Sequence, residues 1–205
     1  MALWLMHTYA AGELGIWNEK DEKCKYAFLL GNIAPDWVNF VPDGRSLYRR
    51  KSHFRHQETA EFLLDDYIKN FYKPQTDKIS IAFYKGYGFH LILDDVWGRE
   101  VYIKYFGKNK TVPKSYYEEC EKWDNIVAQW AWGDESREFL KHTTKYLSGL
   151  DVKEDLVDKK PLEDMIKAAQ SFHYGGTDEK PGIIQEEDIK RVVSESVETY
   201  RKYFE

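Results

Sequence analysis

The sequence predicts an all-α fold, a single globular domain over residues 1–205 with about seven or eight helices. Three observations predict it. Apolar residues recur every three or four positions through most of the chain, as on one face of a helix. Loops rich in Gly, Pro or charge separate these stretches. The length and even composition suit one domain with a sizeable core.

The first half of the chain is expected to contain short helices and loops. Thr8 is a plausible cap for a short helix within residues 3–16, and Gly31 is expected to end a second helix over 26–30. Residues 18–25 are expected to form a solvated turn, and residues 40–51 a loop around a Pro-Asp-Gly turn signal. An amphipathic helix is then expected to begin at residues 52–56 and to end before Pro74.

The second half is more strongly periodic. A long helix over 79–97 explains the apolar pattern better than a strand over 79–84 does. Gly86 and Gly88 lie inside it and would let another backbone approach closely. Ser115 and Glu118 have the form of a capping box for a helix that reaches Trp130 and is broken at residues 133–134. Further helices are expected over 139–147, 162–172 and 189–203.

The composition excludes several classes of protein. Lys and Arg number 30 and Asp and Glu 35, so the formal net charge is -5 and no global basic field would attract nucleic acid. Cys24 and Cys120 are too few for a disulfide scaffold and too far apart for a cysteine-rich zinc site. Any metal must therefore be held by His and carboxylate side chains.

The chain shows no targeting or membrane-spanning signal. Residues 1–6 are apolar but lack the basic region of a signal peptide. No run approaches the roughly 18 apolar residues that a membrane span needs. We therefore expect a soluble cytoplasmic protein without a transmembrane segment.

His90 and Asp94 are the first candidate functional residues. They lie four residues apart in the long helix, so both project from one otherwise apolar face, one turn apart. An unpaired buried polar group costs roughly 1–3 kcal/mol. The two side chains must therefore bind each other or bind something else, such as a metal ion.

Three further polar residues lie in apolar surroundings. Asp36 directly follows a proline, where a stiff backbone suits a metal ligand, a general base or a helix N-cap. His7 lies near the first helix, and His53 lies on the inward face of the helix expected after residue 52. Together with His90 and Asp94 they form a nitrogen and oxygen set that suits Zn²⁺, and also Fe²⁺ or Mn²⁺.

Five basic residues lie close to His53 in the sequence and form a cationic cluster: Arg45, Arg49, Arg50, Lys51 and Arg55. Arg binds phosphate through two hydrogen bonds, so such a cluster beside an active site would suit an anionic substrate. A solvated loop is the alternative interpretation.

The order of these motifs resembles the zinc-dependent phospholipase C-like family. An early His is followed by G-x-I-A-P-D, by a His-Phe pair, and by G-Y-x-x-H-x-x-x-D. Here these are His7, residues 31–36, His53-Phe54 and residues 86–94, within roughly the first 100 residues. The resemblance implies an all-helical fold in which His7, Asp36, His53, His90 and Asp94 bind zinc. It also implies that Asp36 acts as, or beside, the general base of phosphodiester hydrolysis.

The chain departs from the family pattern in two respects. Secreted members use the free amino end of a processed Trp as a ligand, whereas this chain starts at Met1. Members complete a third zinc site with further His and Glu residues, but no His lies between His90 and His142, and Glu100 stands where a His would be expected. We therefore expect one zinc ion, or a pair bridged by Asp94. Additional candidate ligands, each equally suited to a surface or cap role, are His56, His142 and His173.

The expected function is metal-assisted hydrolysis of a phosphate ester, either of a phosphorylated small molecule or of a phospholipid. The metal would activate a water molecule, Asp36 would orient or deprotonate that water, and Arg49 or Arg50 would neutralise the phosphate. An HD-type phosphohydrolase is one alternative, although it requires an adjacent His-Asp pair that the sequence lacks. The other is a non-catalytic helical protein, either with a closed structural metal site or acting as an interaction module.

Overall fold

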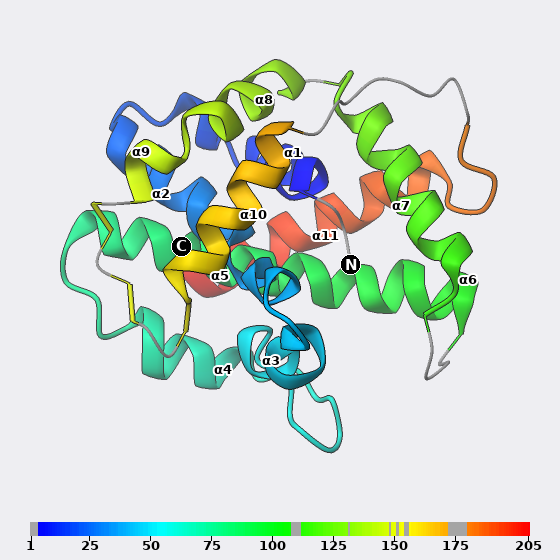
Figure 1. The fold of residues 1–205 in the computed structure, drawn as a ribbon, viewed down its shortest axis with the longest axis horizontal. Helices are drawn as coiled ribbons and strands as arrows, with labels where there is room; N and C mark the ends of the chain where they lie inside the picture. The colour runs from blue at the N-terminus through cyan, green and yellow to red at the C-terminus, as the bar shows by residue number, and fades with distance from the viewer. Residues whose placement is uncertain are drawn as a thin grey trace.

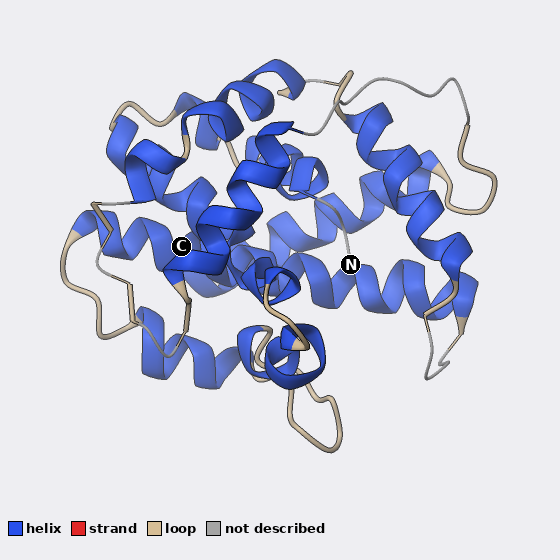
Figure 2. Ribbon diagram, viewed as in Figure 1, coloured by secondary structure: helices blue, strands red, loops and turns tan. Residues whose placement is uncertain are grey.

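The structure, a computed structural model, describes residues 4–107, 112–130, 132–147, 149–150, 152–153, 156–171 and 180–205, apart from the side chains of Arg45 and Ser46. Helices dominate these residues, and no strand occurs among them beyond one isolated bridge between Arg55 and Phe62 (Figure 2). The predicted all-α fold class is therefore confirmed.

Eight α-helices of the described residues have nine or more residues. They are α1 (Trp4–Glu13), α2 (Glu22–Ile33), α3 (Gly44–Ser52), α5 (Lys78–Trp97), α7 (Lys114–Val127), α8 (Gly133–His142), α10 (Lys159–Ser171) and α11 (Glu186–Phe204). Shorter segments are α4 (Leu64–Tyr67), α6 (Lys104–Phe106), α9 (Thr144–Leu147), the 3-10 helices η1 (Ile16–Asn18) and η2 (Ala34–Phe40), and the π-helical turns η3 (Ile68–Tyr72) and η4 (Gly98–Ile103).

Helix α5 runs along the long axis of the molecule, and other helices pack around it (Figure 1). Its crossing with α2 is tight because each helix places a glycine against the other. A Cβ atom on Gly31 would lie 2.0 Å from the carbonyl oxygen of Phe83, and one on Gly86 would lie 1.9 Å from that of Phe28. The expected close backbone approach at Gly86 is therefore confirmed. Gly88 instead faces the ring of Phe204 on α11.

Aromatic side chains fill the space around α5. The ring of Phe89 packs edge-on against Tyr200 of α11 at 5.4 Å between centroids, and Tyr87 stacks with Tyr67 at 5.5 Å. Such pairs stabilise a core beyond the apolar area that they bury. The long helix is thereby held rigidly, and with it the positions of His90 and Asp94.

Two boundaries near the N-terminus differ from the sequence prediction. Helix α1 begins at Trp4, so Thr8 lies inside it and its hydroxyl donates to the carbonyl oxygen of Leu5 at 3.1 Å. Helix α2 begins at Glu22 because the Asp21 side chain accepts backbone N–H bonds and caps it. The predicted turn over 18–25 and the predicted stop at Gly31 are therefore wrong.

The region between residues 40 and 71 shows the largest difference. The expected loop over 40–51 contains α3, and the expected helix from residue 52 is interrupted until α4 begins at Leu64. Phe54 and Ala60 adopt φ angles of 48° and 59°, in the left-handed region that a right-handed helix excludes. The chain therefore leaves the helix at His53, which ends α3 instead of starting the next helix.

The predicted helices of the second half occur with shifted ends. Helix α5 matches the prediction, and α10 and α11 are slightly longer than expected. Ser115 does not cap α7, because this helix begins at Lys114 after Pro113, and α7 ends at Val127 before Trp130. Gly133 starts α8. No helix in the described part of the chain is long and apolar enough to cross a membrane.

Candidate metal centre

Five polar side chains from five parts of the chain meet beside α5. His7 comes from α1, Asp36 from η2, His53 from the residue after α3, and His90 and Asp94 from α5. All are buried or nearly so, with exposed fractions of 0% for the His7 and His90 residues and 8% for the Asp94 side chain. The structure thus brings together all five residues that the sequence predicts as ligands.

The distances between the donor atoms suit a small cation. His53 Nε2 lies 3.3 Å from His90 Nε2, 3.4 Å from Asp94 Oδ2 and 3.5 Å from Asp36 Oδ1. His7 Nε2 lies 3.7 Å from Asp94 Oδ1, and His90 Nε2 lies 3.9 Å from Asp94 Oδ2. Ligand atoms about 2.1 Å from a tetrahedral zinc ion lie about 3.4 Å apart. These separations therefore fit ligands of a metal ion.

Asn32 of α2 contacts the backbone of His7 and the ring of His90. Its side-chain Nδ2 donates to the backbone carbonyl oxygen of His7 at 2.7 Å. The backbone carbonyl oxygen of Asn32 lies 2.9 Å from His90 Nδ1. A carbonyl only accepts, so His90 Nδ1 carries the proton and Nε2 presents a lone pair. The ring of His7 stacks on that of His90 at 4.0 Å with an interplanar angle of 4°. Sequence reasoning missed Asn32, whose only signal is one amide in an apolar helix.

The backbone after α3 places His53. Its Nδ1 lies 3.1 Å from the carbonyl oxygen of Arg49 and 2.8 Å from the hydroxyl of Ser52. The Tyr87 hydroxyl of α5 donates to the Ser52 carbonyl oxygen at 2.6 Å. This contact fixes the end of α3 against α5, so the Nε2 atom of His53 reaches the cluster.

Arg49 closes one side of the cluster. Its Nη2 lies 3.1 Å from Asp94 Oδ2 and its Nη1 lies 3.4 Å from Asp36 Oδ1, while the side chain remains 26% exposed. Arg50 is exposed and projects about 100° away around α3. Arg55 pairs with Asp95 at 2.7 Å instead. Of the two arginines predicted to bind substrate, Arg49 therefore borders the cluster and Arg50 does not.

Burial and mutual contact set the protonation states of the cluster. Burial lowers the pKa of His7 to about 3 and also lowers the pKa of His90. The negative charges of Asp94 and Asp36 act in the opposite direction but are outweighed. Burial alone would raise the pKa of Asp36 and Asp94, but the hydrogen bond with His53 and the neighbouring ring of His90 lower both below their ordinary values. Two neutral imidazoles beside two carboxylates are the protonation states that bind a metal.

Some buried polar atoms of the cluster lack a hydrogen-bond partner among the described residues. These are both ring nitrogens of His7, Oδ1 of Asp94 and Oδ1 of Asn32. Each such atom costs about 1–3 kcal/mol when it is buried without a partner. A divalent cation would compensate the imidazole and carboxylate atoms together, so the residues present fit a metal ion.

The other candidate ligands lie elsewhere. Glu100 pairs with Arg191 at 3.3 Å, the ring of the exposed His56 accepts from the backbone of Thr59, and His142 pairs with Glu138 at 3.5 Å on the surface. His173 lies outside the described residues. None of the first three joins the cluster.

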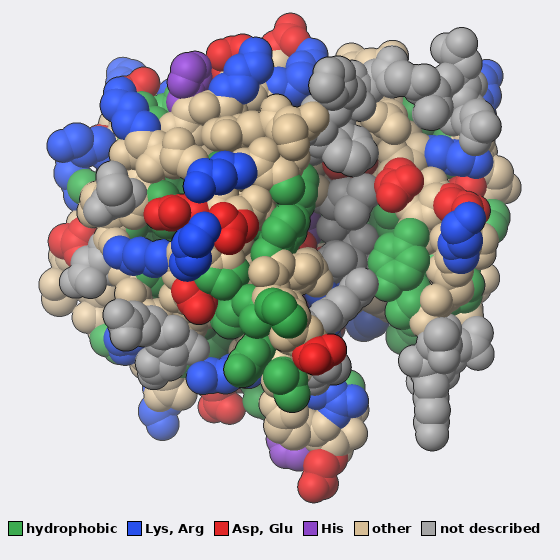
Figure 3. All heavy atoms as spheres, in the orientation of Figure 1, with side chains coloured by type: hydrophobic (Ala, Val, Ile, Leu, Met, Phe, Trp, Pro, Cys, Tyr) green, Lys and Arg blue, Asp and Glu red, His purple; other side chains and the backbone are tan. Residues whose placement is uncertain are grey.

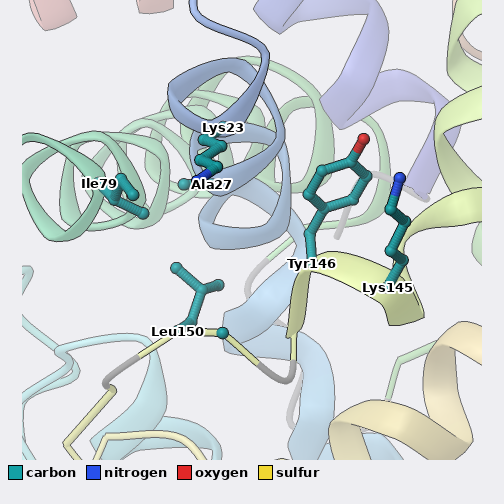
Figure 4. Close-up of a pocket in the computed structure, with 7 residues that line it drawn as sticks. Lys23, Ala27, Ile79, Lys145, Tyr146 and Leu150 are labelled. Atoms are coloured by element: carbon teal, nitrogen blue, oxygen red, sulfur yellow. The ribbon is translucent and has the colours of Figure 1, made fainter.

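A separate pocket, with a volume of about 270 Å³, lies between α2, α5 and α9 (Figure 4). Its lining comprises Lys23, Ala27, Ile79, Lys145, Tyr146, Gly149 and Leu150, and it shares no residue with the cluster. On the molecular face drawn in Figure 3, basic and acidic side chains are intermixed rather than gathered by sign.

Comparisons of the chain with family models, with curated proteins and with solved structures gave no match.

Proposed function

We propose that this protein is a metal-dependent phosphoesterase whose ion is held by residues of the cluster His7, Asp36, His53, His90 and Asp94. One observation carries the proposal: in the part of the chain that the structure describes, both ring nitrogens of the fully buried His7 lack a hydrogen-bond partner, as does Asp94 Oδ1, which lies 3.7 Å from Nε2. A divalent cation would compensate both groups. Imidazole and carboxylate ligands favour zinc, with iron or manganese as alternatives. The motif resemblance to zinc-dependent phospholipase C-like proteins supports the same residues.

The ion would supply Lewis-acid polarisation of a phosphoryl oxygen and lower the pKa of water. Asp36 is ionised and would accept a proton from the attacking water, whose oxygen forms the new bond to phosphorus; the bond to the ester oxygen breaks, and that oxygen would leave with the proton returned by Asp36. Arg49, partly exposed at the edge of the cluster, would bind the negative oxygens of the phosphate.

The substrate class follows from this arrangement. A guanidinium beside a cation site suits a phosphate group, on a small molecule or on a phospholipid. The absence of a nucleic-acid partner and the cytoplasmic location remain predictions from charge and sequence.

Elemental analysis of the purified protein, together with hydrolysis of nitrophenyl phosphate mono- and diesters and of phospholipid vesicles, tests the proposal. The wild type is expected to contain at least one equivalent of a transition metal and to hydrolyse one of these probes. His90→Ala is expected to lose both properties. His142→Ala, which removes an exposed imidazole, is the matched control and should retain both. A His90→Ala protein that keeps its metal and its activity would refute the proposal.

One observation favours a non-catalytic alternative. The Arg49 guanidinium contacts both carboxylates, and Asp36 is only 2% exposed, so the cluster is nearly closed. A closed site with only protein ligands is typical of structural metals. A metal-containing wild type that hydrolyses none of the probes would support this alternative.

A further inference from the structure

We propose that the cluster binds a single divalent ion, at His7, His90 and Asp94 Oδ1, and that the guanidinium of Arg49 takes the place of a second ion. This inference rests on the metal binding proposed above and specifies its number and location. We call the first set the inner position. The outer position comprises Asp36, His53 and Asp94 Oδ2.

The two possible sites compete for one atom. The donor atoms of His7, His90 and Asp94 lie within 4.8 Å of one another, and so do those of Asp36, His53 and His90. Both sets need His90. Its Nδ1 faces the carbonyl oxygen of Asn32 at 2.9 Å, so only Nε2 is left as a ligand. One nitrogen lone pair binds one ion, so a second ion would have only Asp36, His53 and Asp94 Oδ2, the outer position, as ligands.

The inner position is where the protein leaves polar atoms without partners. Both ring nitrogens of His7 and Oδ1 of Asp94 have none among the described residues, although His7 is 0% exposed. His90 Nε2 lies on the same side of the helix, one turn from Asp94. Water has little access to a residue buried to this degree. A cation bound by these three side chains would compensate His7 Nε2 and Asp94 Oδ1, to which no other described residue offers a hydrogen bond.

The outer position already has a cation. Arg49 Nη1 lies 3.4 Å from Asp36 Oδ1, and Nη2 lies 3.1 Å from Asp94 Oδ2. The same two oxygens lie 3.5 and 3.4 Å from His53 Nε2. Asn39 also donates to Asp36 Oδ1, at 3.1 Å. The carboxylate oxygens that a second ion would need are thus hydrogen-bonded by groups of the protein itself.

Charge favours the same assignment. Asp36 and Asp94 supply two negative charges, and Arg49 supplies one positive charge. One divalent ion leaves the cluster with a net charge of about +1, whereas a second ion would raise it to about +3 in a buried region, where uncompensated charge is costly. Arg49 therefore limits the cluster to one ion. Asp36 is then not a ligand: it holds Arg49 beside the inner position and keeps its proposed role as the proton acceptor.

Zinc titration followed by calorimetry and elemental analysis tests the location of the ion. We expect one equivalent in the wild type. His7→Gln should weaken zinc binding by about 100-fold or more, because it removes a ligand. Asp36→Asn should weaken binding less, by about 10-fold, because it removes a nearby negative charge and a contact of Arg49 but no ligand. Circular dichroism of each variant establishes that the helices are retained.

Arg49→Met tests the number of ions. Removal of the guanidinium frees Asp36 Oδ1 and Asp94 Oδ2, so this variant is expected to bind a second equivalent of zinc. Arg50→Met removes an exposed neighbour in the same helix and should still bind one. Both variants keep the inner ligands, so comparing them tests the number of bound ions even if His7→Gln does not fold.

The outcomes separate the two proposals. Two equivalents in the wild type, one equivalent in Arg49→Met, or zinc that is lost in Asp36→Asn and kept in His7→Gln would overturn the single-ion inference while leaving the metal-dependent function intact. A wild type that binds no zinc, iron or manganese would overturn both.

Discussion

Two of the regions that bury polar side chains in this molecule satisfy them differently. On α7, Glu119 accepts backbone N–H bonds from Gly182, Ile183 and Ile184 at 2.9–3.1 Å, and Asp124 accepts them from the start of α1. In the cluster beside α5, by contrast, atoms of His7 and Asp94 have no partner among the described residues. A carboxylate that accepts hydrogen bonds from backbone N–H groups stabilises the fold, whereas an imidazole without a hydrogen-bond partner is available to a ligand.

The two regions are connected through α1. Asp124 Oδ1 accepts from the backbone N–H of Met6 at 2.9 Å, and Oδ2 accepts from that of Leu5 at 3.4 Å. The first N–H groups of a helix lack partners within the helix, so Asp124 caps α1 from a distant part of the chain. His7 is the next residue of the same turn. The structural carboxylate therefore positions the candidate ligand.

The largest predicted effect is a loss of stability on substitution of Glu119 in α7. Glu119→Ala should lower the free energy of unfolding by about 3 kcal/mol, because it leaves three backbone N–H groups without their acceptor and the one at Ile184 is buried. Urea unfolding followed by circular dichroism measures this loss. Glu118→Ala is the matched control: it removes an exposed carboxylate that pairs with Lys114, and should cost less than about 0.5 kcal/mol. Equal losses in the two variants would contradict the structural role of Glu119.

The sequence predicts the cluster beside α5 but not the buried carboxylates of α7. The α5 helix and the five cluster residues are predictable because helical periodicity reveals the buried face and because ordered His and Asp motifs mark it. Glu119 and Asp124 look like ordinary charges in an acidic helix. Only contacts with residues more than 60 positions away distinguish them from exposed Glu118.

The stretch from α3 to α4 is also poorly predictable. Two non-glycine residues, Phe54 and Ala60, adopt positive φ angles that local propensity disfavours, so a helix was expected across them. The location of Arg49 follows from this turn, because the turn lets α3 end at His53 and face α5. Of the basic residues near His53 whose side chains the structure describes, Arg49 thus borders the cluster, whereas Arg50 and Lys51 are exposed.

The second prediction concerns opposite pH dependences of the two regions, measured with a chelator present. Burial raises the pKa of Asp124 to about 7, so between about pH 4 and 7 the native state retains a proton that the unfolded state has released. Stability then falls as pH rises through this window. Burial lowers the pKa of His7 to about 3, so between about pH 3 and 6.5 only the unfolded state is protonated, and stability rises with pH. Each contribution has a slope of up to about 1.4 kcal/mol per pH unit.

Urea unfolding of Asp124→Asn and His7→Leu between pH 4 and 7.5 isolates these contributions as differences from the wild type. The Asn variant should become relatively more stable as pH rises, and the Leu variant relatively less stable. Difference curves of the same sign would show that the two regions do not differ in this way.

The smallest predicted effect is the most direct test of the unpartnered atoms. At pH 7.5 with a chelator, His7→Leu should raise the free energy of unfolding by about 1 kcal/mol, because it replaces two buried nitrogens without partners by an apolar side chain of similar size. Thr8→Val is the matched control, since its hydroxyl already bonds to the carbonyl oxygen of Leu5 and its removal should bring no gain. With zinc at about 100 times its dissociation constant the order reverses, because the wild type gains about 2.7 kcal/mol and His7→Leu gains almost nothing. A chelated His7→Leu protein that is less stable than the wild type would mean that the ring nitrogens of His7 are already satisfied within the fold. His7 would then belong with Asp124 among the structural residues.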